Sequence, residues 1–196
     1  YGGIHAELLK ELGATKFVGY QELSAQATVS ALIADGERVS ELQAGQTGEA
    51  VLDVTPFYAE MGGEVGDTGV IEADGVKVQV VDTKAPEKGL VCHVVKVLEG
   101  TLSQGAAVTA SVDADRRARV TRNHTATHIL HAALRQVLGE HVSQAGSYVG
   151  PDRLRFDFTH FAAVTAEQLA QVERVANEFI MSATPTNIYE TSLDAA

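Results

Sequence analysis

The chain has 196 residues, of which 45% are hydrophobic, and a formal net charge of −11 at pH 7. This length can form a substantial core, and the lack of a long apolar run excludes a membrane-spanning helix. The acidic balance argues against bulk attraction to nucleic acid, and no DNA partner is expected. Cys92 is the only cysteine, which rules out an internal disulfide, and no signal peptide is visible, so we expect a cytoplasmic protein.

Residues 4–12, "IHAELLKEL", predict a short helix that ends at Gly13. Residues 16–112 then show short, alternating, Val-rich segments. They are interrupted by Asp-Gly at 35–36 and 74–75, a strong signal for β-hairpins. Five or more strands at this spacing predict a small barrel or a folded-over sheet.

Apolar and histidine positions recur at helical spacing from about residue 114 to Gly139. Two strands are predicted next, in "HVSQAGSYVG" and "RLRFDFTH". A second helix follows, with Thr165 as its N-cap and Gln168 completing a capping box. We expect its apolar positions to pack in a core: Leu169, Val172, Val175 and Phe179. The segment "PTNIYETSLDAA" then begins an extended stretch. A barrel followed by this two-layer α/β sandwich gives an α+β fold.

The segment "NHTATHILHAAL", residues 123–134, contains three histidines. His124 and His128 are four residues apart, so a helix places them on one face with Cβ atoms about 5–6 Å apart. Such a pair supplies half of a tetrahedral zinc site, and by itself we expect it to bind zinc weakly. Thr125 stands where the HExxH metalloproteases have glutamate, which excludes that class. A purely structural histidine pair is the alternative.

The remaining histidines suggest no second site. His131 lies one turn beyond His128, and we favour a core or junction position for it over a role beside a metal. His5, His93, His141 and His160 form no comparable pattern. Cys92 is interpreted as a small buried hydrophobe rather than a reactive thiol, and strand alternation places its neighbour His93 on the opposite face.

Residues 55–69, "TPFYAEMGGEVGDTG", contain four glycines within eight positions. The segment lacks the lysine of a phosphate-binding P-loop. It is either a wide turn with positive φ angles or a loop whose backbone approaches a ligand, with Phe57 and Tyr58 forming a wall.

Arginines cluster near the start of the predicted histidine helix and again in "PDRLRF", despite the acidic total. This basic cluster comprises Arg116, Arg117, Arg119, Arg122, Arg153 and Arg155. Its members could face a phosphate backbone or pair with Asp113, Asp115 and Asp157. Residue spacing alone does not decide between a phosphate backbone and the nearby aspartates as partners.

Four blocks taken together resemble the alanyl-tRNA synthetase family over nearly the whole chain. They are "FVGYQELSAQATVSAL", "TPFYAEMGGEVGDTG", "RNHTATHILHAALRQVLGEHVSQAGSYVGPDRLRFDFTH" and "NIYETSLDAA". The resemblance implies the end of a preceding helical region at 1–15 and a barrel with the Gly-rich loop at 16–112. It implies an editing domain of the threonyl/alanyl-tRNA synthetase type at 113–196, incomplete at its C-terminus.

The family attaches alanine to tRNA(Ala) with ATP and Mg²⁺ in a catalytic module that this chain lacks. Its editing region hydrolyses tRNA(Ala) that carries serine or glycine, acting on the aminoacylated 3′ end. The family's Zn²⁺ is held by HxxxH, matched by His124 and His128, and by a later CxxxH. That second pair is expected after "ETSLDAA", so the zinc site would be incomplete in this chain.

Gln144 matches the family's editing-pocket glutamine, and Gly62 and Gly63 match the Gly-rich loop beside the pocket. Thr127 and Gln144 are our candidates to bind a serine hydroxyl, because a site that leaves polar groups unpaired rejects alanine. Met61 and Glu64 depart from the family's usual small residue and glutamine, and Met61 puts close approach of the loop in doubt. The alternatives are a free-standing alanyl-tRNA editing protein and a non-catalytic tRNA-docking module.

Overall fold

The computed structural model describes residues 3–182, so the predicted extended segment from Pro185 onward lies outside the described residues. The chain divides into two compact units, each described by itself. Unit 1 comprises Tyr1–Val120 with Gly150–Asp152, and unit 2 comprises Thr121–Val149 with Arg153–Ala196. No helix in the described part of the chain is long and apolar enough to cross a membrane.

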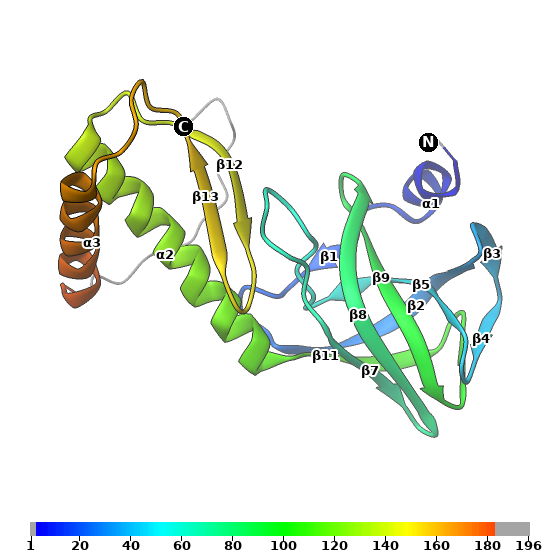
Figure 1. The fold of residues 1–196 in the computed structure, drawn as a ribbon. Coiled ribbons are helices and arrows are strands. Elements are labelled where there is room, and N and C mark those ends of the chain that lie inside the picture. The colour runs from blue at the N-terminus through cyan, green and yellow to red at the C-terminus, as the bar shows by residue number, and fades with distance from the viewer. Residues whose placement is uncertain (1–2, 183–196) are drawn as a thin grey trace. The chain divides into compact units, whose positions relative to one another are not determined.

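Unit 1 is built around a closed antiparallel barrel (Figure 1). Its elements are α1 (Ile4–Leu12), β1 (Lys16–Phe17), β2 (Ser24–Ala34), β3 (Glu37–Val39), β4 (Glu41–Gln43), β5 (Thr47–Leu52), β6 (Val54–Thr55), β7 (Gly69–Ala73), β8 (Val76–Glu87), β9 (Leu90–Glu99), β10 (Thr101–Ser103) and β11 (Ala107–Val112). Six strands follow one another in the order β11-β7-β8-β9-β5-β2, and β2 pairs back with β11 to close the barrel. The small-barrel prediction is therefore confirmed.

The two Asp-Gly pairs form the predicted hairpins. Asp35 and Gly36 join β2 to β3 with φ angles of 51° and 78°, the conformation that a two-residue turn needs to match the strand twist. Gly75, with φ 71°, follows Asp74 in the connection between β7 and β8.

Apolar side chains fill the barrel and also attach α1 to its outside. The cluster that fills the interior includes Val29, Leu52 and Val108. Phe57 is fully buried in the same cluster. A second cluster joins Leu8 of α1 to Ile33, Leu90 and other residues of the barrel wall. Leu8 is 1% exposed, and burying a leucine contributes about 1.5–3 kcal/mol. The predicted helix thus packs on the barrel and ends at Gly13.

Unit 2 contains most of α2 (Ala114–Leu138), the hairpin β12 (Gln144–Val149) and β13 (Leu154–Phe158), and α3 (Ala166–Met181). Gly139 ends α2, and Thr165 and Gln168 form the predicted capping box of α3. The core of the unit gathers α2, the hairpin and α3 around Leu134, Val142 and Val172. Helices together with antiparallel sheet confirm the mixed α+β class.

The apolar face of α3 is less buried than the sequence predicts. Val172 is 5% exposed and Val175 packs beside it, but Leu169 and Phe179 are 56% and 41% exposed. The prediction that all four pack in a core is wrong for these two. Contacts with the core come from the middle turns of α3, so apolar positions nearer its ends remain in solvent.

Candidate functional site

His124 and His128 bring their ring nitrogens together on α2. Their Nε2 atoms are 2.9 Å apart, so one ring donates its N–H to the other, and the ring centroids are separated by 4.7 Å. Bonds of about 2.0–2.1 Å place two nitrogen ligands of a tetrahedral zinc ion about 3.3 Å apart. A small opening of the pair would therefore allow both rings to bind one ion.

The environment favours the neutral form of both imidazoles. Burial lowers the pKa of His124. Burial also lowers the pKa of His128, with further lowering by the charges of His124 and His131. Because metals bind the unprotonated nitrogen, the pair fits zinc as two of the four ligands.

His131 belongs to the core of unit 2. Its ring lies 5.0 Å from that of Phe156. Its buried Nε2 has no hydrogen-bond partner within the described part of the chain. A buried nitrogen without a partner costs about 1–3 kcal/mol, and packing of the ring against Phe156 offsets part of that cost.

Two polar side chains predicted at the site also lie in unit 2. The Thr127 hydroxyl donates to the Asn123 carbonyl at 2.8 Å, one helical turn earlier. Gln144 is exposed at the start of β12, where its amide donates to Ser147 Oγ at 3.0 Å, next to an irregularity in the hairpin register. The Thr127 oxygen and the Gln144 carbonyl oxygen are both of a type that accepts a hydroxyl proton.

The Gly-rich loop, in unit 1, contains a tight turn. Met61 and Glu64 exchange two backbone hydrogen bonds, of 3.2 and 3.0 Å, across Gly62 and Gly63. These glycines have φ angles of 58° and 87°, in the left-handed region that disfavours other residues. Met61 is 61% exposed. The positive φ angles are those expected of glycines in a turn, but the turn is tight rather than wide.

Close packing within the protein explains another glycine of this loop. A Cβ on Gly66 would lie 2.2 Å from the Thr83 carbonyl oxygen, so no larger residue fits there. Phe57 forms no ligand wall, because it is fully buried in the barrel core. Its position at the end of an alternating segment did not indicate that it belongs to this core.

A buried ion pair fixes the loop to the start of α2, within unit 1. Arg117 pairs with Asp67 and donates to the carbonyls of Gly19 and Pro56 at 2.5 and 2.6 Å. Asp67 also accepts from the Tyr58 amide at 2.8 Å. Sequence spacing could not reveal this pair, because its two members lie 50 residues apart.

Other arginines also find defined partners. Arg116 donates to the Gly66 carbonyl at 2.9 Å, Arg119 lies 3.9 Å from Asp152, and Arg155 lies 3.2 Å from Asp157. Of the local pairings considered from the sequence, the structure contains the one between Arg155 and Asp157. Arg117, whose side chain is 17% exposed, holds the fold together rather than forming part of a basic surface.

Glu64 is a carboxyl group with an unusual proton affinity. Burial, followed by the charge of Asp67, raises its pKa to about 7, while a hydrogen bond from Tyr58 and the charge of Arg117 act in the opposite direction. Burial and the neighbouring Glu64 also raise the pKa of the Tyr58 phenol. The loop therefore changes its charge near neutral pH.

Two of the side-chain groups in the structure contain histidines for which the sequence showed no pattern comparable to that of His124 and His128. In unit 1, His5, Glu49 and Cys92 bring three possible metal-ligand atoms within 4.8 Å of one another. In unit 2, His141 Nε2 and His160 Nδ1 are 2.8 Å apart. Both groups join elements distant in sequence, which residue spacing does not encode. Cys92 itself is fully buried, as predicted, and burial raises its pKa to about 12.

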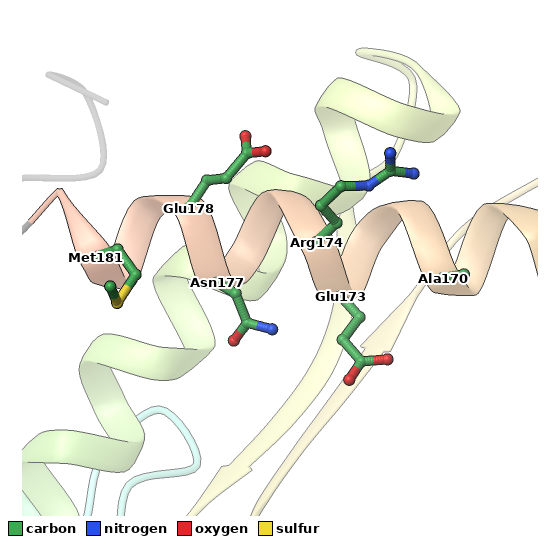
Figure 2. A pocket seen from close by; sticks show the side chains of 6 residues that line it. All are labelled: Ala170, Glu173, Arg174, Asn177, Glu178 and Met181. Atoms are coloured by element: carbon green, nitrogen blue, oxygen red, sulfur yellow. The ribbon is translucent and has the colours of Figure 1, made fainter.

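Two open pockets occur in the described part of the chain, one in each unit. Figure 2 shows one of about 430 Å³ along α3, lined by Ala170, Glu173, Arg174, Asn177, Glu178 and Met181. A second, of about 590 Å³, lies over β7, β8 and β11 and includes Gly69. Neither is lined by His124, His128 or Gln144.

Comparison with known proteins assigns the chain to a family. A family model described as tRNA synthetases class II (A) matches residues 4–116, more than half of the chain. The chain is 47% identical over 195 residues to alanine–tRNA ligase of Desulforamulus reducens, covering 100% of this chain and 22% of that protein. Identity is 50% over 182 residues with the enzyme of Acetivibrio thermocellus, covering 93% and 21%. With that of Bradyrhizobium diazoefficiens it is 51% over 175 residues, covering 89% and 20%. The chain spans about a fifth of the length of these relatives.

Proposed function

The chain belongs to the class II (A) tRNA synthetases, and we propose that it is a segment of an alanine–tRNA ligase that hydrolyses tRNA(Ala) carrying serine or glycine. The parent enzyme would attach alanine to tRNA(Ala) with ATP and Mg²⁺, using parts outside this chain. The observation that carries the editing proposal is the pair of neutral imidazoles, His124 and His128, with Nε2 atoms 2.9 Å apart.

His124 and His128 would hold a zinc ion together with two ligands from beyond Ala196. When bound, zinc supplies a Lewis acid that polarises the ester carbonyl. The contribution of the chain's own residues is to present two unprotonated nitrogens on one helix face. The lowered pKa of both rings supports that role, since little free energy is then spent on removing a proton.

Thr127 and Gln144 are proposed to distinguish serine from alanine. A serine hydroxyl would donate to the Thr127 oxygen or to the Gln144 carbonyl oxygen. Alanine has no hydroxyl and would leave these acceptors unpaired, at a cost of about 1–3 kcal/mol each. A second site is needed because one methyl or hydroxyl group changes binding in an apolar pocket by only about 1–3 kcal/mol.

Gly62 and Gly63 are also proposed to take part, through a backbone that approaches the aminoacylated 3′ end. Two observations support this role. The space where a side chain would stand on Gly62 is open, since a Cβ there would meet nothing within 4 Å. The Met61 side chain is largely exposed to solvent.

The test is hydrolysis of Ser-tRNA(Ala) by the parent-length enzyme with His124→Ala or His128→Ala. We expect a loss of about 100-fold or more, since metal polarisation supplies several kcal/mol. Activation of alanine, measured by ATP–pyrophosphate exchange, should be unchanged. His141→Ala is the matched control, because it removes an exposed histidine from the same unit. If both variants hydrolyse Ser-tRNA(Ala) like the wild type, the editing proposal is wrong.

A further inference from the structure

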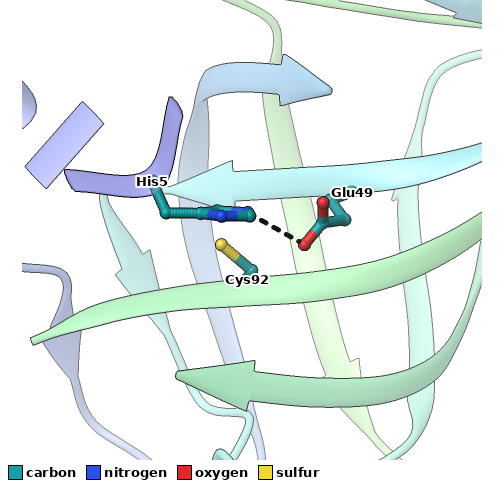
Figure 3. Close-up of side chains that lie close together, drawn as sticks. All are labelled: His5, Glu49 and Cys92. Carbon is teal, nitrogen blue, oxygen red and sulfur yellow. Dashed lines mark hydrogen bonds and ion pairs between the residues drawn. The ribbon is translucent and has the colours of Figure 1, made fainter. Parts of the chain in front are cut away.

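Three side chains from separate elements of unit 1 converge on one point. Figure 3 shows His5 of α1, Glu49 of β5 and Cys92 of β9 pointing toward one another. His5 Nε2 lies 3.3 Å from Glu49 Oε1, and Cys92 Sγ lies within 4.8 Å of a ring nitrogen of His5 and of a carboxylate oxygen of Glu49. An imidazole, a carboxylate and a thiol form a donor set that suits zinc.

The spacing of the ligand atoms is close to that of a zinc site. Around a tetrahedral ion with bonds of about 2.0–2.1 Å, a nitrogen and an oxygen ligand are about 3.3 Å apart. The observed separation of His5 Nε2 and Glu49 Oε1 is 3.3 Å. A zinc–sulfur bond of about 2.3 Å would place sulfur about 3.6 Å from each of them, compared with the limit of 4.8 Å that the three ligand atoms satisfy without metal.

The surroundings are apolar on one side and open on the other. Cys92 is fully buried in the cluster that joins Leu8 of α1 to Leu90 of the barrel wall. The side chains of His5 and Glu49 are 29% and 30% exposed. An ion can therefore enter from solvent, and a water molecule can occupy a fourth position. The apolar floor strengthens electrostatic attraction by lowering the local dielectric constant.

We propose that His5, Glu49 and Cys92 bind one zinc ion, with water as the fourth ligand, and that this ion fastens α1 to the barrel. On binding, the Cys92 S–H bond breaks, its proton leaves to solvent and a zinc–sulfur bond forms. Without metal the thiol stays protonated, because burial raises its pKa to about 12. His5 and Glu49 are then held by their mutual contact alone.

The test uses the 196-residue chain with His124→Ala and His128→Ala combined, which removes the histidine pair of unit 2. After dialysis against a chelator, Co²⁺ is added as a spectroscopic substitute for zinc. We expect a sulfur-to-cobalt charge-transfer band and the visible bands of tetrahedral Co²⁺, both abolished by stoichiometric zinc. Because Cys92 is the only cysteine, a charge-transfer band identifies this site.

Three further changes in the same background locate the ligands. Cys92→Ala should abolish the charge-transfer band, while His5→Gln and Glu49→Gln should weaken Co²⁺ and zinc binding about tenfold or more, since even groups that only orient ligands have effects of that size. Circular dichroism checks that each variant is folded. His5 and Glu49 are partly exposed, so their variants decide the matter even if Cys92→Ala fails to fold.

The proposal is overturned if the folded background protein gives no charge-transfer band, or if neither His5→Gln nor Glu49→Gln weakens binding. It is independent of editing, since Ser-tRNA(Ala) hydrolysis depends on the histidine pair that the background variant lacks.

Discussion

Replacing Arg117 with methionine should destabilise unit 1 strongly. Methionine keeps the length of the apolar stem but removes the guanidinium group, which pairs with Asp67 and donates to the carbonyls of Gly19 and Pro56. Asp67 would keep the hydrogen bond from the Tyr58 amide. Its carboxylate would otherwise remain buried without a counter-ion.

The size of the effect follows from burial. The side chains of Arg117 and Asp67 are 17% and 6% exposed, so solvent can replace little of the lost interaction. Removing one partner of a buried pair costs about 3–5 kcal/mol. The remaining amide bond to Asp67 and the partial exposure of Arg117 favour the lower end, about 3 kcal/mol. The free energy of unfolding of a domain is about 5–15 kcal/mol in total, so the variant should lose a fifth or more of its stability.

Urea denaturation followed by far-ultraviolet circular dichroism measures this loss. Arg119→Met is the matched control, because Arg119 also lies on the first turns of α2 but is 50% exposed, 3.9 Å from Asp152. An exposed pair of this kind contributes about 0–1 kcal/mol. Asp67→Asn, alone and combined with Arg117→Met, completes a double-mutant cycle that isolates the pair.

The reasoning is refuted if Arg117→Met costs less than about 1 kcal/mol, the range of an exposed pair. It is also refuted if the cycle gives no coupling between Arg117 and Asp67, because the loss would then come from the carbonyl contacts or from packing.

Three further predictions concern the loop and the editing site. The pKa of Glu64 is raised by burial from 4.5 to about 7, so the folded protein keeps a proton that the unfolded chain loses, and stability falls as pH rises between those values. Glu64→Gln should therefore raise the melting temperature at pH 8 but not at pH 4, and an equal change at both would contradict this. Gly62→Ala should cost about 1 kcal/mol in urea denaturation, because its φ of 58° is strained for alanine; a neutral result would exclude this turn conformation. Gln144→Phe in the parent-length enzyme should reduce Ser-tRNA(Ala) hydrolysis with unchanged zinc content, whereas loss of zinc would show that Gln144 supports the metal.

Local structure could be predicted from the sequence because its causes are local. The Asp-Gly pairs have the backbone freedom that hairpin turns need, and Thr165 satisfies a free amide at the start of α3. Helical spacing likewise predicted that His124 and His128 are neighbours. That part of the candidate site follows from the geometry of a single helix.

The rest depends on which elements meet, and residue spacing does not specify this. Asp67 could not be matched to Arg117, which lies 50 residues away. The sequence does not indicate which strand the helix of His5 packs against. The contact between His5 and Glu49 was therefore not predicted. The exposed Phe179 shows the same limitation, because periodicity indicates an apolar face and not whether anything covers it. Gly62, Gly63, Thr127 and Gln144 stay predictions as site residues.

Closure of the barrel has a consequence for its synthesis. The barrel closes through β2 and β11, where Gln26 bonds to Thr109, 83 residues later. At roughly 5–20 residues per second, a ribosome needs about 4–17 s to make the chain between them. Until β11 emerges, β2 and β7 each keep an unpaired edge that could join a neighbouring nascent chain. The barrel therefore has no unpaired strand edge at this position only after β11 has paired with both β2 and β7.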